Sequence, residues 1–270
     1  MRDLKTLFSL GLFLSLLWLQ GCSDSLDTDA PPPSTETPPL AELTSAAPPD
    51  FSQFAAGPAR KQAFFDYFVP LIDQGNQQIM HQRKRLLRLI DQIKPTQPLP
   101  DSDQAWLLEK AQAYQVPFES AAPLATLKRL KPKLDKVPVS LALAQAANES
   151  AWGTSRFARD GHNYFGQWCY TPGCGLVPKQ RAKTAKHEVK RFSHPFASVK
   201  SYLRNLNTHP AYRPFRQIRA QQRAQKQPLD AARLAQGLKQ YSQRGLSYVE
   251  ELQAMIRYNQ LTRYDASSKP

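Results

Sequence analysis

Glycine is scarce in this sequence: only 11 of the 270 residues are glycine, against 23 prolines. We find no glycine-rich loop of the kind that cradles phosphate groups, and no internal repeat. The sequence therefore gives no sign of a phosphate-binding loop or of a repeat architecture. The many prolines indicate linkers and helix boundaries instead of glycine-rich turns.

Acidic residues are also few. The 22 Asp and Glu residues oppose 36 Lys and Arg residues, which gives a net charge of +14. An excess of positive charge suits an anionic partner such as nucleic acid, anionic lipid or a cell-wall polymer. Nucleic acid is not expected as a partner, because the charge is not accompanied by any nucleic-acid-binding motif. The length allows one or two domains.

Long apolar runs are missing as well, apart from residues 7–19, which follow a basic N-terminus and are too short to span a bilayer comfortably. Gly21 and Cys22 follow this run and resemble the cleavage box of bacterial lipoproteins. The resemblance implies that residues 1–21 are a signal peptide and that Cys22 carries the lipid. Because Ser23 follows instead of Asp, it also implies attachment to the outer membrane, facing the periplasm. The alternative is an ordinary signal peptide with an incidental cysteine.

Cysteine is the third scarce residue, with three in the chain. If Cys22 carries the lipid, Cys169 and Cys174 remain, and between them Pro172 and Gly173 fit a type II turn. The periplasm oxidises such pairs, so we predict a disulfide that closes a hairpin tip. Metal binding is the alternative, but two cysteines without a second matched pair are too few for a structural zinc site.

The composition of the remaining chain changes twice. Residues 22–50 are rich in proline, threonine, serine and acidic residues, and are predicted to be a disordered tether. Residues 51–131 show helical periodicity, with a first apolar face that ends at Pro70. Residues 132–264 form the predicted second domain, and the tail from Asp265 is expected to be disordered.

Polar residues at three positions predict helix starts. Asp101 with Gln104, and Ser247 with Glu250, have the spacing of a capping box. Asp230 is a predicted N-cap.

The most informative stretch is residues 137–153. Pro138 suits the first turn of a helix, and the residues after it are largely apolar, with no charge before Glu149. A helix that is apolar on nearly every face is a buried helix. Glu149 comes near its end, just before Trp152 and the predicted terminator Gly153. Burial raises the pKa of a carboxyl group, which makes it a proton donor at neutral pH. The alternative is a glutamate that simply reaches solvent.

A second carboxylate has the opposite surroundings. Glu188 is the one acidic residue between Gly161 and Leu229, among many lysines and arginines. That field should lower its pKa and keep it ionised. Two carboxylates kept apart in pKa are what the cleavage of glycosidic bonds uses. The alternative is a surface residue that balances the local lysines.

Aromatic residues gather in the same part of the chain, and their flat faces can stack on sugar rings. The alternative is that several belong to the core, and Phe165 is expected there. Residues 167–192 are predicted to form an irregular lobe of two or three strands. The aromatic residues are Trp152, Tyr164, Phe165, Trp168 and Tyr170.

Five motifs in this order resemble the glucosaminidase domain of glycoside hydrolase family 73. They are AQAANESAWG at 144–153, NYFG at 163–166, FASVKSYL at 196–203, HPAY at 209–212, and the pair Tyr241 and Tyr248. The match covers about residues 132–261. Residues 205–213, with the helical N-terminal half, also resemble the Bax-type proteins of Gram-negative bacteria. The resemblance implies a mainly α (α+β, lysozyme-like) fold, with a helical catalytic lobe, a small β-hairpin lobe and a helical N-terminal region.

The resemblance also assigns roles. Glu149 aligns with the catalytic general acid, and Glu188 falls where the second, mobile acid is expected. The tyrosine string of the family is Tyr-Ala-Thr-Asp-Pro-x-Tyr, whereas here eight residues run from Tyr241 to Tyr248 without Asp-Pro. Tyr241 is favoured as the catalytic tyrosine and Tyr248 is the second choice. Substrate contacts are expected from the aromatic and polar side chains Trp152, Asn163, Tyr164, Trp168 and Tyr248.

The activity implied is hydrolysis of the β-1,4 bond after N-acetylglucosamine in peptidoglycan, for which no metal and no cofactor is expected. Either Glu188 activates water directly, or the acetamido group of the substrate attacks. The expected partners are glycan strands and, through the lipid anchor, a membrane; the protein is expected to be a monomer. A lytic transglycosylase is the second interpretation, although the Gly-Leu-Met-Gln segment of those enzymes is not found. A non-catalytic, wall-binding lipoprotein is the third.

Overall fold

The computed structural model describes residues 47–94, 98–179, 181 and 184–268. The expected signal peptide (residues 1–21), Cys22 and most of the expected tether (residues 22–50) lie outside the described residues. None of the described helices combines the length and the apolar composition needed to cross a membrane.

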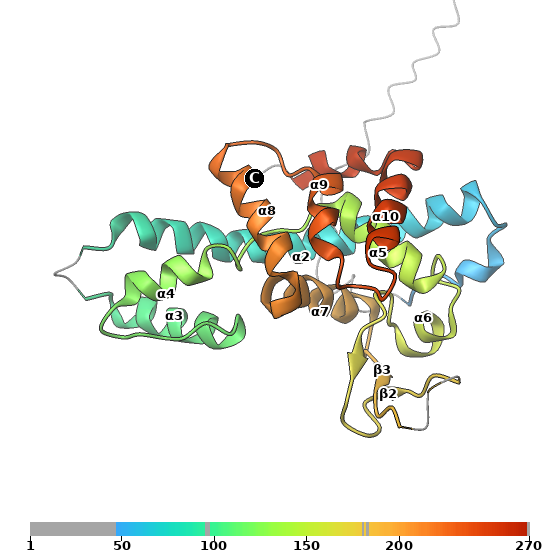
Figure 1. Ribbon diagram of the computed structural model, residues 1–270, viewed down its shortest axis with the longest axis horizontal. Helices are drawn as coiled ribbons and strands as arrows, with labels where there is room; N and C mark the ends of the chain where they lie inside the picture. Colours follow the sequence, from blue (N-terminus) through green and yellow to red (C-terminus); the bar gives the residue numbers. More distant parts are fainter. Residues whose placement is uncertain (1–46, 95–97, 180, 182–183, 269–270) are drawn as a thin grey trace, which may run out of the picture. The chain divides into compact units, whose positions relative to one another are not determined.

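The described residues are mainly helical, with one small sheet (Figure 1). The N-terminal region contains η1 (Phe51–Gln53), α2 (Pro58–Gln92), α3 (Asp101–Ala113) and α4 (Pro123–Leu130). The rest contains α5 (Val139–Ser150), α6 (Arg156–Gly161), β1 (Trp168–Cys169), β2 (Gly175–Leu176), β3 (Glu188–Lys190), α7 (Pro195–Thr208), η2 (Pro210–Tyr212), α8 (Arg213–Ala224), α9 (Ala231–Ala235), η3 (Gln236–Leu238), α10 (Leu246–Tyr258) and η4 (Leu261–Ser268). The expected mainly α fold with a small β-hairpin lobe is confirmed.

α5 is the buried centre of the fold. Every residue from 139 to 147 is buried, as the sequence predicted. The helix contacts α2, α9, α10 and η4, which surround it. It ends one turn before the predicted terminator, because Ala151 and Trp152 already adopt left-handed backbone angles. Gly153 follows with φ of +79°, and a side chain there would meet the ring of Phe51 at 2.2 Å.

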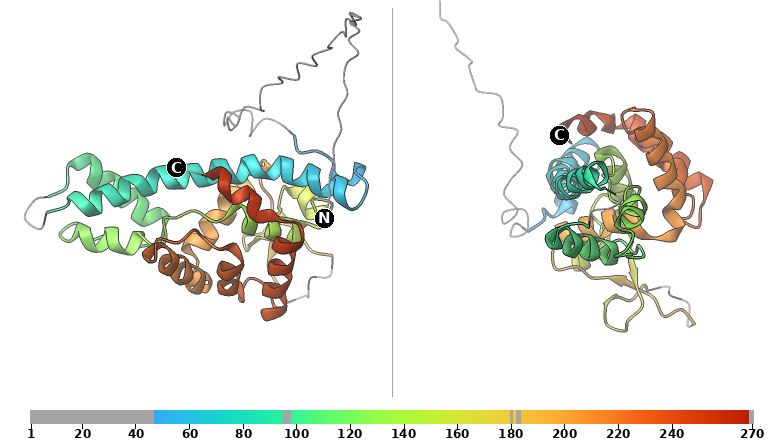
Figure 2. Two further views of the ribbon diagram at one scale, coloured as in Figure 1. Left: turned by 90° about the horizontal axis from the view of Figure 1, so that it is seen from above. Right: turned by 90° about the vertical axis from the view of Figure 1, so that its left-hand side faces the viewer.

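α2 is one continuous helix although Pro70 lies in its interior. A proline inside a helix removes a backbone hydrogen bond and costs roughly 3 kcal/mol. Phe68 and Leu71, on either side of Pro70, are both buried, and the helix packs against α5 and α7. Figure 2 shows α2 as the long blue-to-cyan helix beside the rest of the fold. Burial of apolar side chains on both sides of Pro70 offsets its cost, so the apolar face continues past it.

The β lobe is a three-stranded antiparallel sheet in the order β1–β3–β2. A disulfide joins Cys169 to Cys174 at the tip between β1 and β2, which confirms the predicted bond. Gly175 lets β2 lie close to β3, since an added Cβ would come within 2.0 Å of the Val189 carbonyl oxygen. The lobe therefore depends on a covalent link and on a close backbone approach.

Two predicted caps and the predicted end of the fold are wrong. Pro100 is the N-cap of α3, and Gln104 donates to the Leu99 carbonyl instead of closing a capping box. α10 begins at Leu246 after Gly245, so the expected Ser247 cap lies inside the helix. The third cap, Asp230, is confirmed, because its side chain accepts from the Arg233 amide.

The tail does not leave the fold at Asp265. The Asp265 carboxylate accepts hydrogen bonds from the Ser140 amide at 2.9 Å and from the Ser140 hydroxyl at 2.6 Å. It therefore caps the first turn of α5 from a position 125 residues away in the chain.

Candidate active site

A cleft of about 1040 Å³ opens at the C-terminal end of α5. Its walls come from the start of β1, from η2 and from the segment that leads into α10. The carboxyl group of Glu149 faces it, together with the aromatic side chains Phe165, Trp168, Tyr170, Tyr212 and Tyr241. An acid surrounded by flat aromatic faces suits a carbohydrate chain.

Burial raises the pKa of Glu149, as the sequence predicted. A hydrogen bond from Tyr248 and the positive charge of Arg244 act in the opposite direction, and the negative charge of Glu251 raises the pKa further. Arg244 is itself paired with Glu251 at 2.6 Å. The carboxyl group of Glu149 therefore stays protonated to a higher pH than an exposed one. Tyr248 and Arg244 can stabilise the carboxylate once the proton has left.

Gly166 allows the carboxyl group to occupy this place. Its φ is +63°, and an added Cβ would lie 2.9 Å from Oε2 of Glu149. Any side chain here would both strain the backbone and press on the acid. The glycine at the end of the 163–166 motif therefore shapes the site directly.

A chain of buried hydrogen bonds lies behind Glu149. The Tyr202 hydroxyl donates to Oε1 of Gln145 at 2.7 Å, and Nε2 of Gln145 donates to the Tyr248 hydroxyl at 3.0 Å. Tyr248 is then hydrogen-bonded to Glu149. Because its oxygen already accepts from Gln145, its own proton is directed at the carboxylate.

Sequence reasoning missed Gln145 and Tyr202. The signal was present for Gln145: it is a polar residue in an apolar helix, four residues before Glu149 and so on the same face.

The two candidate tyrosines lie at different depths below the surface of the cleft. Tyr248 is fully buried behind the acid, whereas Tyr241 is half-buried and lines the cleft. Their rings are parallel, with centroids 5.6 Å apart, and the Tyr241 hydroxyl donates to the Phe165 carbonyl at 2.8 Å. The structure thus brings both to the acid, one from the cleft side and one from the core side.

Glu188 does not line this cleft. Its two carboxylate oxygens accept hydrogen bonds from the amides of Gly173, at 3.0 Å, and Gly175, at 2.8 Å. Its pKa is lowered, as expected, but the main cause is these two backbone hydrogen bonds, and Arg181 contributes least. The side chain is 7% exposed and, in this conformation, holds the hairpin together beside the disulfide.

The expected substrate contacts divide into two groups. Trp168 is 51% exposed on the cleft wall, where it stacks on His187, so it remains a candidate contact. Asn163 and Tyr164 are only 1% exposed and do not line the cleft. Trp152 also lies outside it and packs edge-on against two phenylalanines of α2.

The structure thus places Asn163, Tyr164 and Trp152 outside the lining of the cleft, and also Tyr248, which is fully buried and reaches the site only through Glu149; substrate contact by these four side chains stays a prediction. Asn163 has a supporting role, since its Nδ2 donates to the carbonyls of Gln167 and Lys190.

One cluster among the described residues has metal-ligand spacing, formed by Cys169, Cys174 and Glu188. The two sulfur atoms are joined in the disulfide, and both carboxylate oxygens are engaged by amides. The cluster does not fit a metal ion.

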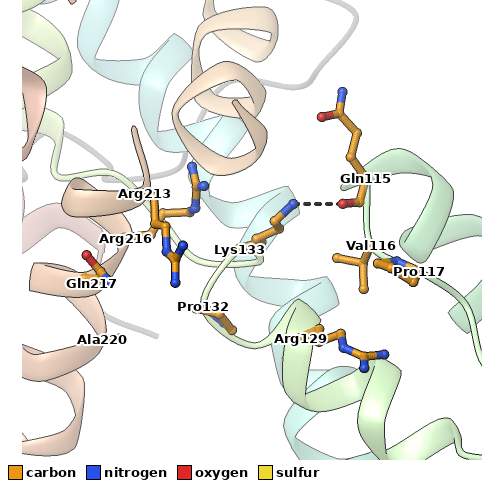
Figure 3. A pocket seen from close by; sticks show the side chains of 10 residues that line it. All are labelled: Gln115, Val116, Pro117, Arg129, Pro132, Lys133, Arg213, Arg216, Gln217 and Ala220. Carbon is orange, nitrogen blue, oxygen red and sulfur yellow. Dashed lines mark hydrogen bonds between the residues drawn. The ribbon is translucent and has the colours of Figure 1, made fainter. Parts of the chain in front are cut away.

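A separate cavity of about 500 Å³ lies between the segment after α3 and α8 (Figure 3). Lys133, which lines it, donates to the carbonyls of Tyr114 and Gln115. The other charged residues in its wall are Arg129, Arg213 and Arg216. No carboxyl group is among its lining residues, so acid catalysis is not expected there.

Comparison with known proteins identifies the family of the chain. A family model described as glucosaminidase (mannosyl-glycoprotein endo-beta-N-acetylglucosaminidase) matches residues 125–261. A curated relative, Protein bax of Escherichia coli (strain K12), is 36% identical over 222 residues, which cover 80% of this chain and 76% of the relative. No solved structure matches the chain.

Proposed function

The chain belongs to the glucosaminidase family, and from that premise we propose that it cleaves the β-1,4 bond after N-acetylglucosamine in peptidoglycan. The observation that carries the proposal is the placement of Glu149. Its carboxyl group faces a large aromatic cleft, burial raises its pKa, and Tyr248 bonds to it from behind. That is the arrangement of a general acid.

In the first step Glu149 gives its proton to the leaving glycosidic oxygen as the bond from C1 to that oxygen breaks. The carboxylate that forms is stabilised by the Tyr248 hydroxyl and by the positive charge of Arg244. Gln145 and Tyr202 keep the Tyr248 proton directed at the acid. Tyr248, Gln145 and Tyr202 position the acid and do not contact the substrate.

For the second half of the reaction we favour attack by the acetamido oxygen of the substrate on C1. Water then opens the cyclic intermediate and returns a proton to Glu149. This route is supported by Glu188, whose two oxygens are already held by hairpin amides away from the cleft. Tyr241, on the cleft wall, is the residue we assign to steady the intermediate.

The test uses purified peptidoglycan and mass spectrometry of the new ends, with wild type and Glu149→Gln in parallel. We expect reducing-end N-acetylglucosamine from the wild type and none from the variant. Anhydro-muramic ends would identify a lytic transglycosylase instead. Binding to sacculi without any new ends would support a wall-binding protein. A variant that keeps more than a few per cent of turnover would refute the assignment of Glu149.

We also propose that the protein is a lipoprotein of the periplasm, attached through Cys22 to the outer membrane. The proposal depends on the sequence pattern of residues 1–22. Cys22→Ser should move the protein from the membrane fraction to the soluble fraction. A variant that stays in the membrane fraction would contradict it.

A further inference from the structure

A second hollow, of about 520 Å³, adjoins the cleft. Gln167, Trp168 and Asn205 line both cavities, so these three side chains form the boundary between the cleft and the second hollow. A polymer whose sugars fill the cleft would thus have its substituents beside this hollow.

The second hollow is strongly basic. Lys190 from β3 and Lys200 and Arg204 from α7 line it, and none of its lining residues is acidic. Lys200 and Arg204 are four residues apart and lie on the same face of α7. We call these three side chains the basic shelf.

The basic shelf differs from the cationic cluster in the interior of the described residues. In the interior, Arg83, Arg219 and Arg223 surround one carboxylate, that of Asp135. For the basic shelf, no ion pair with a carboxylate is found among the described residues.

Both lysines of the basic shelf instead lie over aromatic rings. The ammonium group of Lys190 lies 5.1 Å from the ring centroid of Phe192, and that of Lys200 lies 5.0 Å from that of Phe196. These contacts position the cations without neutralising them.

The hollow continues toward the N-terminal region. A smaller cavity of about 270 Å³ shares Lys200 and Arg204 with it. Its opposite walls come from α2, through Gln82, and from α3, through Glu109 and Lys110, which are paired with each other at 2.8 Å. The helices that precede the matched domain therefore form part of one path that starts at the acid.

We propose that the basic shelf binds the carboxylate groups of the peptide stems on a glycan strand in the cleft, and that α2 and α3 form the far wall of this stem site. The inference depends on the proposed function, because it needs a glycan strand beside Glu149. Exposed ion pairs are individually weak and sensitive to salt. Several together give a preference for stem-bearing strands and leave the glycan contacts unchanged.

The experiment measures binding of the full chain, in detergent, with the acid disabled by Glu149→Gln so that the substrate stays intact. The two substrates are sacculi with their stems and glycan strands from which an amidase has removed the stems. Into this background we introduce Lys200→Gln with Arg204→Gln. The matched control is Lys84→Gln with Arg88→Gln, which removes the same charge from an exposed face of α2.

We expect the shelf variant to bind stem-bearing sacculi about fivefold more weakly and to bind stripped strands as before. The control pair should bind both substrates as the parent does. Added salt should weaken the binding of the parent to stem-bearing sacculi and leave the shelf variant less affected.

Equal losses on both substrates, or no loss on either, would overturn the stem site. A third arm uses vesicles of phosphatidylglycerol, since phosphate is also an anion. If the shelf variant loses only vesicle binding, the shelf binds lipid phosphate and the inference fails. The binding test needs no turnover, so a wild type that releases no fragments would refute the proposed function and leave the stem preference to be judged separately.

Discussion

Tyr248→Phe tests the idea that a buried hydroxyl tunes the acid. The change removes the hydrogen bond to Glu149 and leaves the ring, which packs against Tyr241, in place. A hydrogen bond to a charged group contributes about 1.5–3 kcal/mol. The carboxylate is only partly formed in the transition state, so we use the lower end, which corresponds to a roughly tenfold fall in kcat. KM should change little, because the hydroxyl does not reach the cleft.

The pH dependence of kcat shows in which direction the pKa of Glu149 moves in the variant. The Tyr248 hydrogen bond lowers the pKa of Glu149, so its loss should raise that pKa. A general acid works in its protonated form, and activity falls as pH rises through its pKa. The basic limb of kcat should therefore move to higher pH in the variant.

The assay is the release of soluble fragments from peptidoglycan across pH, with Tyr241→Phe as the matched control. Tyr241 bonds to the Phe165 carbonyl and not to the acid, so its variant should keep the basic limb of the wild type. Tyr248→Phe also leaves Nε2 of Gln145 without its acceptor, so Tm is measured alongside. A basic limb that stays in place, or moves to lower pH, would refute the reasoning.

Three further predictions concern the fold, the acid and the product. Asp135→Asn should lower the free energy of unfolding by about 3–5 kcal/mol, because it leaves three buried or half-buried guanidinium groups without their carboxylate; thermal unfolding measures this, with the exposed Asp91→Asn as control. Burial alone would raise the pKa of Asp135, but Arg219 and the other two arginines outweigh it and lower the pKa. Its stabilisation is therefore complete above the unfolded pKa near 3.8 and is lost as pH falls through the lower folded value, a dependence that the variant should lack. Gly166→Ala should reduce kcat about tenfold or more, because the added methyl group contacts the Glu149 carboxyl group, and should lower Tm only slightly. Full activity in this variant would contradict the geometry. If the acetamido group attacks, NMR of fresh product should show the new reducing end in the β configuration, whereas an α end would point to direct attack by water.

The sequence by itself determined the features that depend on neighbouring residues or on ordered motifs. Residues 139–147 are predicted to be buried because almost all of them are small or apolar, and no partner has to be known. The disulfide follows from two cysteines five residues apart around a turn. The family follows from the order of five motifs, and the raised pKa of Glu149 follows from its place on the buried helix.

Only the tertiary structure decided which side chains line the cleft, which are buried and which contact one another. The resemblance favoured Tyr241 over Tyr248, but it did not show that one lines the cleft and the other is buried, because that difference arises when α10 packs on α5. Glu188 has a lowered pKa as predicted, yet the donors that lower it are hairpin amides brought together by strand pairing. Asp265 was expected in a disordered tail because its partner, Ser140, lies 125 residues earlier.

The physical reason is the range of the interactions concerned. Burial of a helix and closure of a short loop depend on composition over a few residues, so periodicity and spacing predict them. Hydrogen bonds, stacking and the path from the cleft to the basic shelf join residues that are distant in the chain. Such contacts depend on how α2, α5, α7 and α10 pack together, which local patterns do not specify.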